Sequence, residues 1–167
     1  GVSPSDFKKS DKKKILGSTE VEDIENKYRF YKKIKDEFLT PMTFRVSDID
    51  EAIEINETYK ENQFILKPLK GSGGYDINLL DSDARIQFND GEFILQEYVD
   101  GINLSSSILA TNMNVKSIIN TRLLTEHDFG AENSFIYIGN ILPLTRESIM
   151  SDVKDINEIN ETMKRTS

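Results

Sequence analysis

The chain has 167 residues, a length that suits one domain or two small lobes, and its formal net charge of −8 is acidic. This charge argues against a general nucleic-acid binder, although it leaves room for a local basic pocket that takes an anionic ligand. The absence of cysteine excludes disulfides, thiolate metal ligands and a cysteine nucleophile. No apolar run approaches the roughly 18 residues of a membrane span, and residues 1–14 lack the apolar segment of a signal peptide, so we expect a cytoplasmic protein.

The first half of the sequence alternates between predicted helices and strands. Residues 20–38 carry apolar side chains at helical spacing, which predicts one amphipathic helix that ends at the following LTP. Alternating residues 42–46 predict a strand. Residues 47–60 predict a second helix with Ser47 as its N-cap and Glu51 near a capping-box position. The segments QFILKPL and DINLL predict two more strands on either side of a glycine-rich loop.

The second half predicts mainly strands. The polar residues 82–92 predict a short helix and turn, and the residues from 146 onward have helical spacing. The strands are expected at residues 92–99, 103–111, 115–125 and 134–144. This order predicts an α+β protein with two lobes, at roughly residues 26–95 and 96–167.

The stretch FILKPLKGSGGYD is the strongest candidate for a binding site. It places Lys67 on a strand and Gly71, Ser72, Gly73 and Gly74 in the loop that follows. Lysine supplies a point charge to phosphate oxygens, and a loop without bulky side chains lets backbone N–H groups approach an anion. The pattern therefore predicts a phosphate-binding site, although it matches neither a Walker A loop nor a GxGxxG turn. The alternative is an ordinary glycine-rich hairpin whose lysine reaches solvent.

The order of this KP strand, the glycine loop and then QEYV-x-G resembles the ATP-grasp superfamily. Upstream, the stretch from LGST to VSDIDEAIE resembles the family segment in which a "DK" lysine opens a helix. Here that lysine is Lys27, and Asn26 replaces the usual aspartate. The resemblance runs from about residue 15 to 165. It implies an α+β, two-lobed ATP-grasp-like fold truncated at both ends, with residues 1–25 a remnant of a preceding lobe or linker.

The resemblance also implies roles for particular residues. Lys27 and Lys67 would hold ATP phosphates, and the glycine loop would form a mobile lid over them. The residues that would line the adenine pocket are Gln96, Glu97, Tyr98 and Val99, with the Val99 backbone as an adenine partner. Asn103 stands where many members place a ribose-binding glutamate. Without the resemblance, Lys27 would be read as a solvated lysine, and Tyr98 and Val99 as core strand residues.

Two further side chains are weaker candidates. Arg122 would be a substrate or phosphate contact, and the alternative is a surface arginine. His127, the only histidine, lies in a polar loop without partners that would make a catalytic constellation. The family also binds Mg²⁺ through later acidic residues, but Glu158 and Glu161 fall in the predicted tail helix. We therefore expect no metal ligand in this chain, and Mg²⁺ only in a longer parent protein.

The resemblance implies that the chain is the ATP-binding core of an ATP-dependent carboxylate–amine ligase. The whole ligase would form an amide through an acylphosphate, and this core would be inactive alone. The segments QEYVDGINLSSSILAT, NTRLL and FIYIGNILPL resemble most closely the branch that contains tyramine–glutamate ligase and related small-molecule ligases. Its expected partners are ATP, a small carboxylate and an amine, without nucleic acid or membrane. The sequence does not specify the acid, the amine or the oligomeric state. The alternatives are a non-catalytic nucleotide-binding or regulatory module of the same fold, and a structural domain in which the glycine loop is only a turn.

Overall fold

The computed structural model describes residues 21–80, 92–111, 114–131 and 134–145, to which the structural statements below refer. The helices are α1 (Glu22–Glu25), α2 (Lys27–Ile34), α3 (Ile49–Thr58) and the 3₁₀ helix η3 (Glu126–Phe129). The strands are β1 (Thr43–Val46), β2 (Phe64–Pro68), β3 (Asn78–Leu80), β4 (Phe93–Glu97), β5 (Leu104–Thr111), β6 (Asn114–Thr125) and β7 (Tyr137–Ile141). Helices combined with antiparallel sheets confirm the predicted α+β class. The expected tail helix lies outside the described residues. The helix and turn expected at residues 82–92 also lie outside them, except for residue 92.

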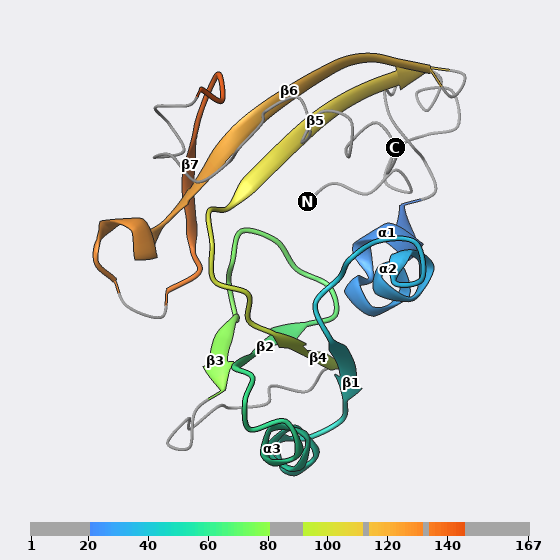
Figure 1. The fold of residues 1–167 in the computed structure, drawn as a ribbon, viewed down its shortest axis with the longest axis vertical. Helices are drawn as coiled ribbons and strands as arrows, with labels where there is room; N and C mark the ends of the chain where they lie inside the picture. The colour runs from blue at the N-terminus through green and yellow to red at the C-terminus, as the bar shows by residue number, and fades with distance from the viewer. Residues whose placement is uncertain (1–20, 81–91, 112–113, 132–133, 146–167) are drawn as a thin grey trace, which may run out of the picture.

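The strands of this part of the chain form two antiparallel sheets (Figure 1). The first sheet has the strand order β1-β4-β2-β3, and the second has the order β5-β6-β7. The chain passes from the first sheet to the second once, through residues 98–103 between β4 and β5. The division expected after residue 95 therefore falls inside β4, whose last residues still pair with β1 and β2.

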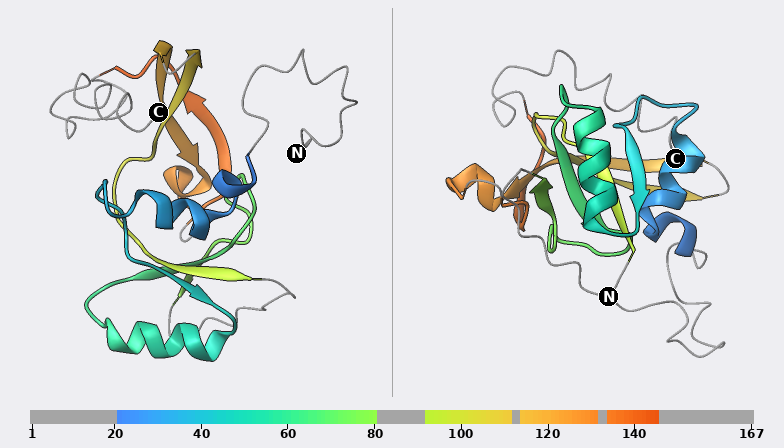
Figure 2. Two further views of the ribbon diagram at one scale, coloured as in Figure 1. Left: turned by 90° about the vertical axis from the view of Figure 1, so that its right-hand side faces the viewer. Right: turned by 90° about the horizontal axis from the view of Figure 1, so that it is seen from below.

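The first sheet has one apolar face and one face that carries polar groups. Side chains alternate between the faces of a strand. One face carries the main hydrophobic core, which includes Val46, Phe64, Leu66, Phe93 and Leu95 and packs on Ala52 of α3. Figure 2 shows α3 lying across this face. The register places Thr43, Ile65, Lys67 and Gln96 together on the opposite face.

The single helix expected at residues 20–38 is divided into α1 and α2 at Asn26. Asn26 has an extended conformation (ψ 104°), ends α1 and caps α2, where its side chain accepts the Arg29 N–H. An asparagine offers the backbone this local alternative to a continuous helix. None of the helices in the described ranges is long and apolar enough to cross a membrane.

The predicted N-cap of the next helix is wrong by one residue. Asp48 caps α3 by accepting the Glu51 N–H at 2.9 Å. Ser47 precedes the cap and donates its own N–H and hydroxyl to the Glu51 carboxylate. The capping box is therefore shared between two adjacent polar residues, and aspartate takes the cap position because its carboxylate is the better-placed acceptor.

Replacement of a core leucine tests this arrangement of faces. Leu95 is fully buried in the core, whereas Leu109 on β5 is 55% exposed. We expect Leu95→Ala to lower the free energy of unfolding by about 3 kcal/mol because it leaves a cavity, and Leu109→Ala by less than about 1 kcal/mol. Urea denaturation of both variants measures the difference, and equal losses would contradict the assignment of the core face.

Candidate functional site

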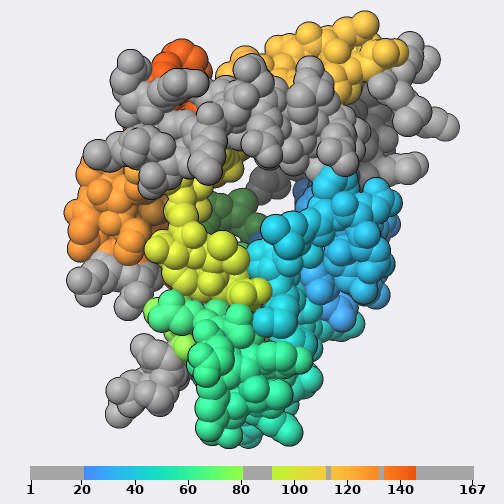
Figure 3. Space-filling model, in the orientation of Figure 1, coloured from blue at the N-terminus to red at the C-terminus, as the bar shows by residue number. Residues whose placement is uncertain are grey.

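A cleft of about 700 Å³ lies between the two sheets. The space-filling view is hollowed between the segment that follows β4 and the region of α2 and β1 (Figure 3). The first sheet contributes Ile65, Lys67 and Gln96 to the cleft. The second contributes side chains from β5, β6, η3 and β7, and the connecting residues 98–103 form a further wall. The cleft is therefore built where the two sheets meet.

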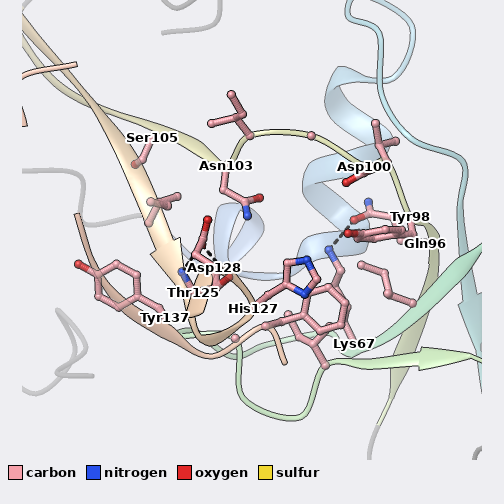
Figure 4. A pocket seen from close by; sticks show the side chains of 18 of the residues that line it. Lys67, Gln96, Tyr98, Asp100, Asn103, Ser105, Thr125, His127, Asp128 and Tyr137 are labelled. Atoms are coloured by element: carbon pink, nitrogen blue, oxygen red, sulfur yellow. Dashed lines mark hydrogen bonds between the residues drawn. The ribbon is translucent and has the colours of Figure 1, made fainter. Parts of the chain in front are cut away.

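Lys67 is the central charged group of the first-sheet wall. Its ammonium donates a hydrogen bond of 2.6 Å to the Gln96 side-chain oxygen, as Figure 4 shows. Burial of the side chain, together with the nearby charge of Lys27, lowers the pKa of Lys67 to about 8. A buried lysine with a pKa this low is typical of a functional site, because shielding from water disfavours its charged form.

Lys27 is half-buried and contacts the backbone at the start of the glycine loop. As the first residue of α2, it donates its backbone N–H to Leu69 O at 3.0 Å. Its ammonium donates to Pro68 O and to Gly71 O, both at 3.1 Å, and burial lowers its pKa. In the part of the chain that the structure describes, neither Lys27 nor Lys67 is in an ion pair with a carboxylate. The two lysines therefore form a shielded region of positive charge.

The glycine loop connects β2 and β3 of the first sheet and contacts the second sheet on the way. Gly71 and Ser72 are exposed, whereas Gly73 and Gly74 line the cleft. Gly73 O accepts the Tyr137 N–H at 2.8 Å. Gly74 lies so close to the Phe135 carbonyl that a Cβ added there would overlap it. The absence of a side chain at Gly74 is thus a requirement for contact between the loop and the second sheet.

The predicted adenine-pocket residues line the cleft, and Glu97 and Tyr98 also make hydrogen bonds to protein groups outside it. The Glu97 carboxylate accepts the Met42 N–H at 3.1 Å and the Asn62 side-chain amide at 2.8 Å. The Tyr98 backbone N–H donates to Gln63 O at 2.7 Å. Glu97 is therefore held in place at the end of β4 by groups that directly precede β1 and β2.

The other expected residues of this wall are more accessible. The Tyr98 ring meets Phe135 edge-on, with the ring centroids 5.9 Å apart. Val99 is 64% exposed, which does not fit a core strand residue, and Asn103 is an exposed residue that lines the cleft. The cleft thus brings together eight of the expected site residues: Lys67, Gly73, Gly74, Gln96, Glu97, Tyr98, Val99 and Asn103.

An arginine–aspartate pair lies on the second-sheet wall. Arg122 donates to Asp128 at 2.9 Å, and the two side chains are only 20% and 22% exposed. Hydrogen bonds from the Thr125 N–H and from Arg122 hold the pKa of Asp128 below its usual value. Arg122 and the exposed His127 both line the cleft (Figure 4 shows His127 and Asp128). Arg122 is therefore a cleft residue and not a surface arginine.

Several of these contacts have no signal in the sequence. Thr43 holds the Gln96 side chain, and Phe135 and Tyr137 contact the glycine loop. No local pattern marks them, because each depends on a pairing between distant segments. The capping box of Thr125 and Asp128 does have a local signal, the T-x-x-D spacing before η3.

The described residues do not fit a Mg²⁺ site. Among them there is no group of three or more His, Cys, Asp or Glu side chains that could hold a metal ion. Two of the cleft carboxylates, Glu97 and Asp128, are already engaged by protein donors. In the part of the chain that the structure describes, the cation that the first-sheet wall offers to a ligand is therefore Lys67.

Residues 24–165 match the family model of the ATP-grasp domain, and the chain belongs to that family. It is 35% identical over 98 residues to an uncharacterized protein of Methanocaldococcus jannaschii, MJ0776, a match that covers 56% of this chain and 25% of that protein. It is also similar to the solved ATP-grasp ligase PsnB in complex with a minimal precursor, with a TM-score of 0.48 and 16% identity. That alignment covers 87% of this chain and 43% of PsnB. The chain thus spans a quarter of the first relative and under half of the second.

Alanine substitutions at two glycines separate backbone strain from the contact between loop and sheet. Gly74 (φ 79°) and Gly130 (φ 93°) both have positive φ, but a Cβ at Gly130 meets nothing within 4 Å. We expect Gly130→Ala to cost about 1 kcal/mol of unfolding free energy, and Gly74→Ala to cost more because it also overlaps Phe135. Thermal unfolding measures both, and hydrogen exchange of the Tyr137 amide should accelerate only in Gly74→Ala. Equal exchange rates would contradict the contact.

The low pKa of Lys67 also predicts a pH-dependent stability difference. Between pH 8 and 10.5 the unfolded chain binds the lysine proton and the folded chain does not, so the wild-type stability rises with pH through this range. We expect the free energy of unfolding of the wild type to rise by roughly 2 kcal/mol relative to that of Lys67→Met between pH 7 and pH 10. Urea denaturation of both proteins across this range measures it. A stability difference independent of pH would show that Lys67 is not desolvated.

Proposed function

We propose that this chain binds ATP in the cleft between its two sheets, with the phosphates at Lys67 and the glycine loop. The observation that carries the proposal is the shielded, positively charged region formed by Lys67 and Lys27. A largely buried ammonium group at Lys67 beside the half-buried one of Lys27 is unfavourable by itself, and an anion beside them offsets that cost. A triphosphate is the anion that the family would supply.

The rest of the nucleotide is assigned to the wall formed by residues 96–103. The adenine would lie against Tyr98 and Val99, with a Val99 backbone group as its hydrogen-bond partner. Asn103 would bind a ribose hydroxyl, for which its amide has both donors and an acceptor. The volume of the cleft, about 700 Å³, lies within the usual range for small-molecule sites. The backbone N–H groups of the glycine loop and the lysines would meet the phosphates, with Lys27 reaching them from behind the loop.

For the whole protein we propose an amide-forming ligase of the carboxylate–amine type. The γ-phosphoryl group would pass from ATP to a carboxylate oxygen of the substrate, and ADP would leave. The amine nitrogen would then attack the acyl carbon, phosphate would leave with its bonding electron pair, and the nitrogen would lose a proton. In this scheme Lys67 neutralises negative charge on the transferred group, which is the main requirement of phosphoryl transfer. Family membership supports this chemistry, with the parts of the chain before and after residues 98–103 as its two lobes.

Calorimetric titration with ATP, with and without Mg²⁺, tests the binding site. We expect the wild type to bind and Lys67→Met to bind at least tenfold more weakly, because the variant loses a charge-assisted contact to phosphate. Lys60→Met is the matched control, since Lys60 is an exposed residue just beyond α3 and does not line the cleft. Its affinity should equal that of the wild type.

The result that would overturn the proposal is a wild-type chain that releases no heat and shows no thermal shift up to millimolar ATP. Equal weakening by Lys67→Met and Lys60→Met would overturn the assigned position of the phosphates. ADP formation is followed in the same samples. Binding without ADP formation, in this chain and in the longer protein, would identify a non-catalytic nucleotide-binding module.

A further inference from the structure

We propose that Gln96 is a positioning residue for Lys67, and that Gln96, itself held by Thr43, fixes the direction of the ammonium group without neutralising its charge. This inference rests on the proposed function, because it assigns the reason why Lys67 is available to an anion. It also changes the role expected for Gln96. In the sequence Gln96 is a candidate adenine contact, whereas its side chain is engaged at both ends by protein groups.

Strand register brings the three side chains together. Gln96 on β4 lies opposite Thr43 of β1 on one side and opposite Ile65 of β2 on the other. Lys67 follows two residues after Ile65 and therefore points from the same face of the sheet. A diagonal neighbour of this kind is within reach of long side chains such as lysine and glutamine. The contact is thus a product of three strands that are distant in the sequence.

The hydrogen bonds also define the orientation of the Gln96 amide. The Thr43 hydroxyl donates to Pro41 O at 3.0 Å, so its hydrogen is occupied and it must accept from the Gln96 nitrogen, 2.9 Å away. The amide oxygen is then directed at the Lys67 ammonium, 2.6 Å away. The reversed amide would place two donors against each other at Lys67 and an acceptor against an oxygen at Thr43. Only one orientation satisfies all of these groups.

The neutrality of Gln96 is the second half of the argument. A carboxylate at this position would also accept from Lys67, but it would cancel the positive charge that an anionic ligand requires. Glutamine holds the ammonium group and leaves both Lys67 and the nearby Lys27 available to attract an anion. Other titratable groups also line the cleft, namely Glu97, Tyr98, Asp100, Arg122, His127, Asp128 and Tyr137. Of the groups around it, Lys27 is the one whose charge acts on Lys67.

Two pairs of variants separate positioning from simple packing. Gln96→Met keeps the length of the side chain and removes the acceptor, whereas Gln96→Glu keeps the acceptor and adds a charge. Thr43→Val removes the hydroxyl that orients the Gln96 amide, whereas Thr43→Ser keeps that hydroxyl. Thr43 is only 6% exposed and does not line the cleft, so it reaches a ligand only through Gln96. Circular dichroism and thermal unfolding establish that each variant is folded.

The first measurement is the titration of Lys67 in nucleotide-free protein, followed by NMR of ¹³C-labelled lysine and assigned by its absence in Lys67→Arg. From the wild-type pKa of about 8, we expect a decrease of roughly one unit in Gln96→Met and an increase of roughly one unit in Gln96→Glu. Thr43→Val should lower the pKa of Lys67, whereas Thr43→Ser should leave that pKa at its wild-type value. If all four variants titrate as the wild type does, Gln96 has only a packing role and the inference is overturned.

The second measurement is the affinity of each variant for ATP by calorimetry at pH 7.5. We expect Gln96→Met and Thr43→Val to bind roughly tenfold more weakly, because the ammonium group is no longer fixed. Gln96→Glu should also weaken binding, although its lysine is more firmly protonated, because the site has lost net positive charge. Wild-type affinity in Gln96→Glu would overturn the claim about neutrality. A wild-type chain that binds no ATP would overturn the proposed function, while the NMR titration would still decide the role of Gln96.

Discussion

The antiparallel register of β2 against β4 is the constraint on which the site depends. It directs Phe64 and Leu66 toward α3 and directs Ile65 and Lys67 toward the cleft. A slip of one residue would reverse every side chain of β2, so that Lys67 would enter the core and Leu66 would face the cleft. Burial of a lysine charge among apolar side chains and loss of a fully packed leucine both oppose such a slip. The packing of the core therefore determines which face of the sheet carries Lys67.

The cleft combines features that are costly for stability and useful for binding. Shielding from water lowers the pKa of Lys67 and also that of Lys27, so the fold tolerates charges that it does not neutralise within its described residues. On the second-sheet side of the cleft, by contrast, the charges of Arg122 and Asp128 are paired with each other. Among the described residues, the two lysines with lowered pKa values thus lie on the side of the cleft that the glycine loop adjoins. Such a division is expected of a site that supplies an anion with its counter-charge.

The sequence predicted the main elements well where local periodicity was strong. The strands and α3 lie within a few residues of their predicted positions. Lys67, Gly73, Gly74 and residues 96–99 line one cleft as the motif order predicted, whereas Lys27, Gly71 and Ser72 do not line it. The break at Asn26 was missed because the apolar spacing continues across it, whereas the asparagine side chain caps a new helix there. The cap at Asp48 was missed because Ser47 and Asp48 are both short polar residues that can cap a helix. The roles of Thr43, Phe135 and Tyr137 could not be predicted, since each contact joins segments that only the strand pairing brings together.

The glycine loop connects these constraints. On its first-sheet side, the Lys27 ammonium holds the carbonyls of Pro68 and Gly71. On the far side, the Tyr137 N–H holds the carbonyl of Gly73, and Gly74 rests on Phe135. Because a phosphate is a stronger acceptor for an ammonium group than a neutral carbonyl, an anion in the cleft would compete for Lys27 and loosen the first attachment while leaving the second. The loop is therefore held on its first-sheet side by Lys27, whose charge adds to burial in lowering the pKa of Lys67.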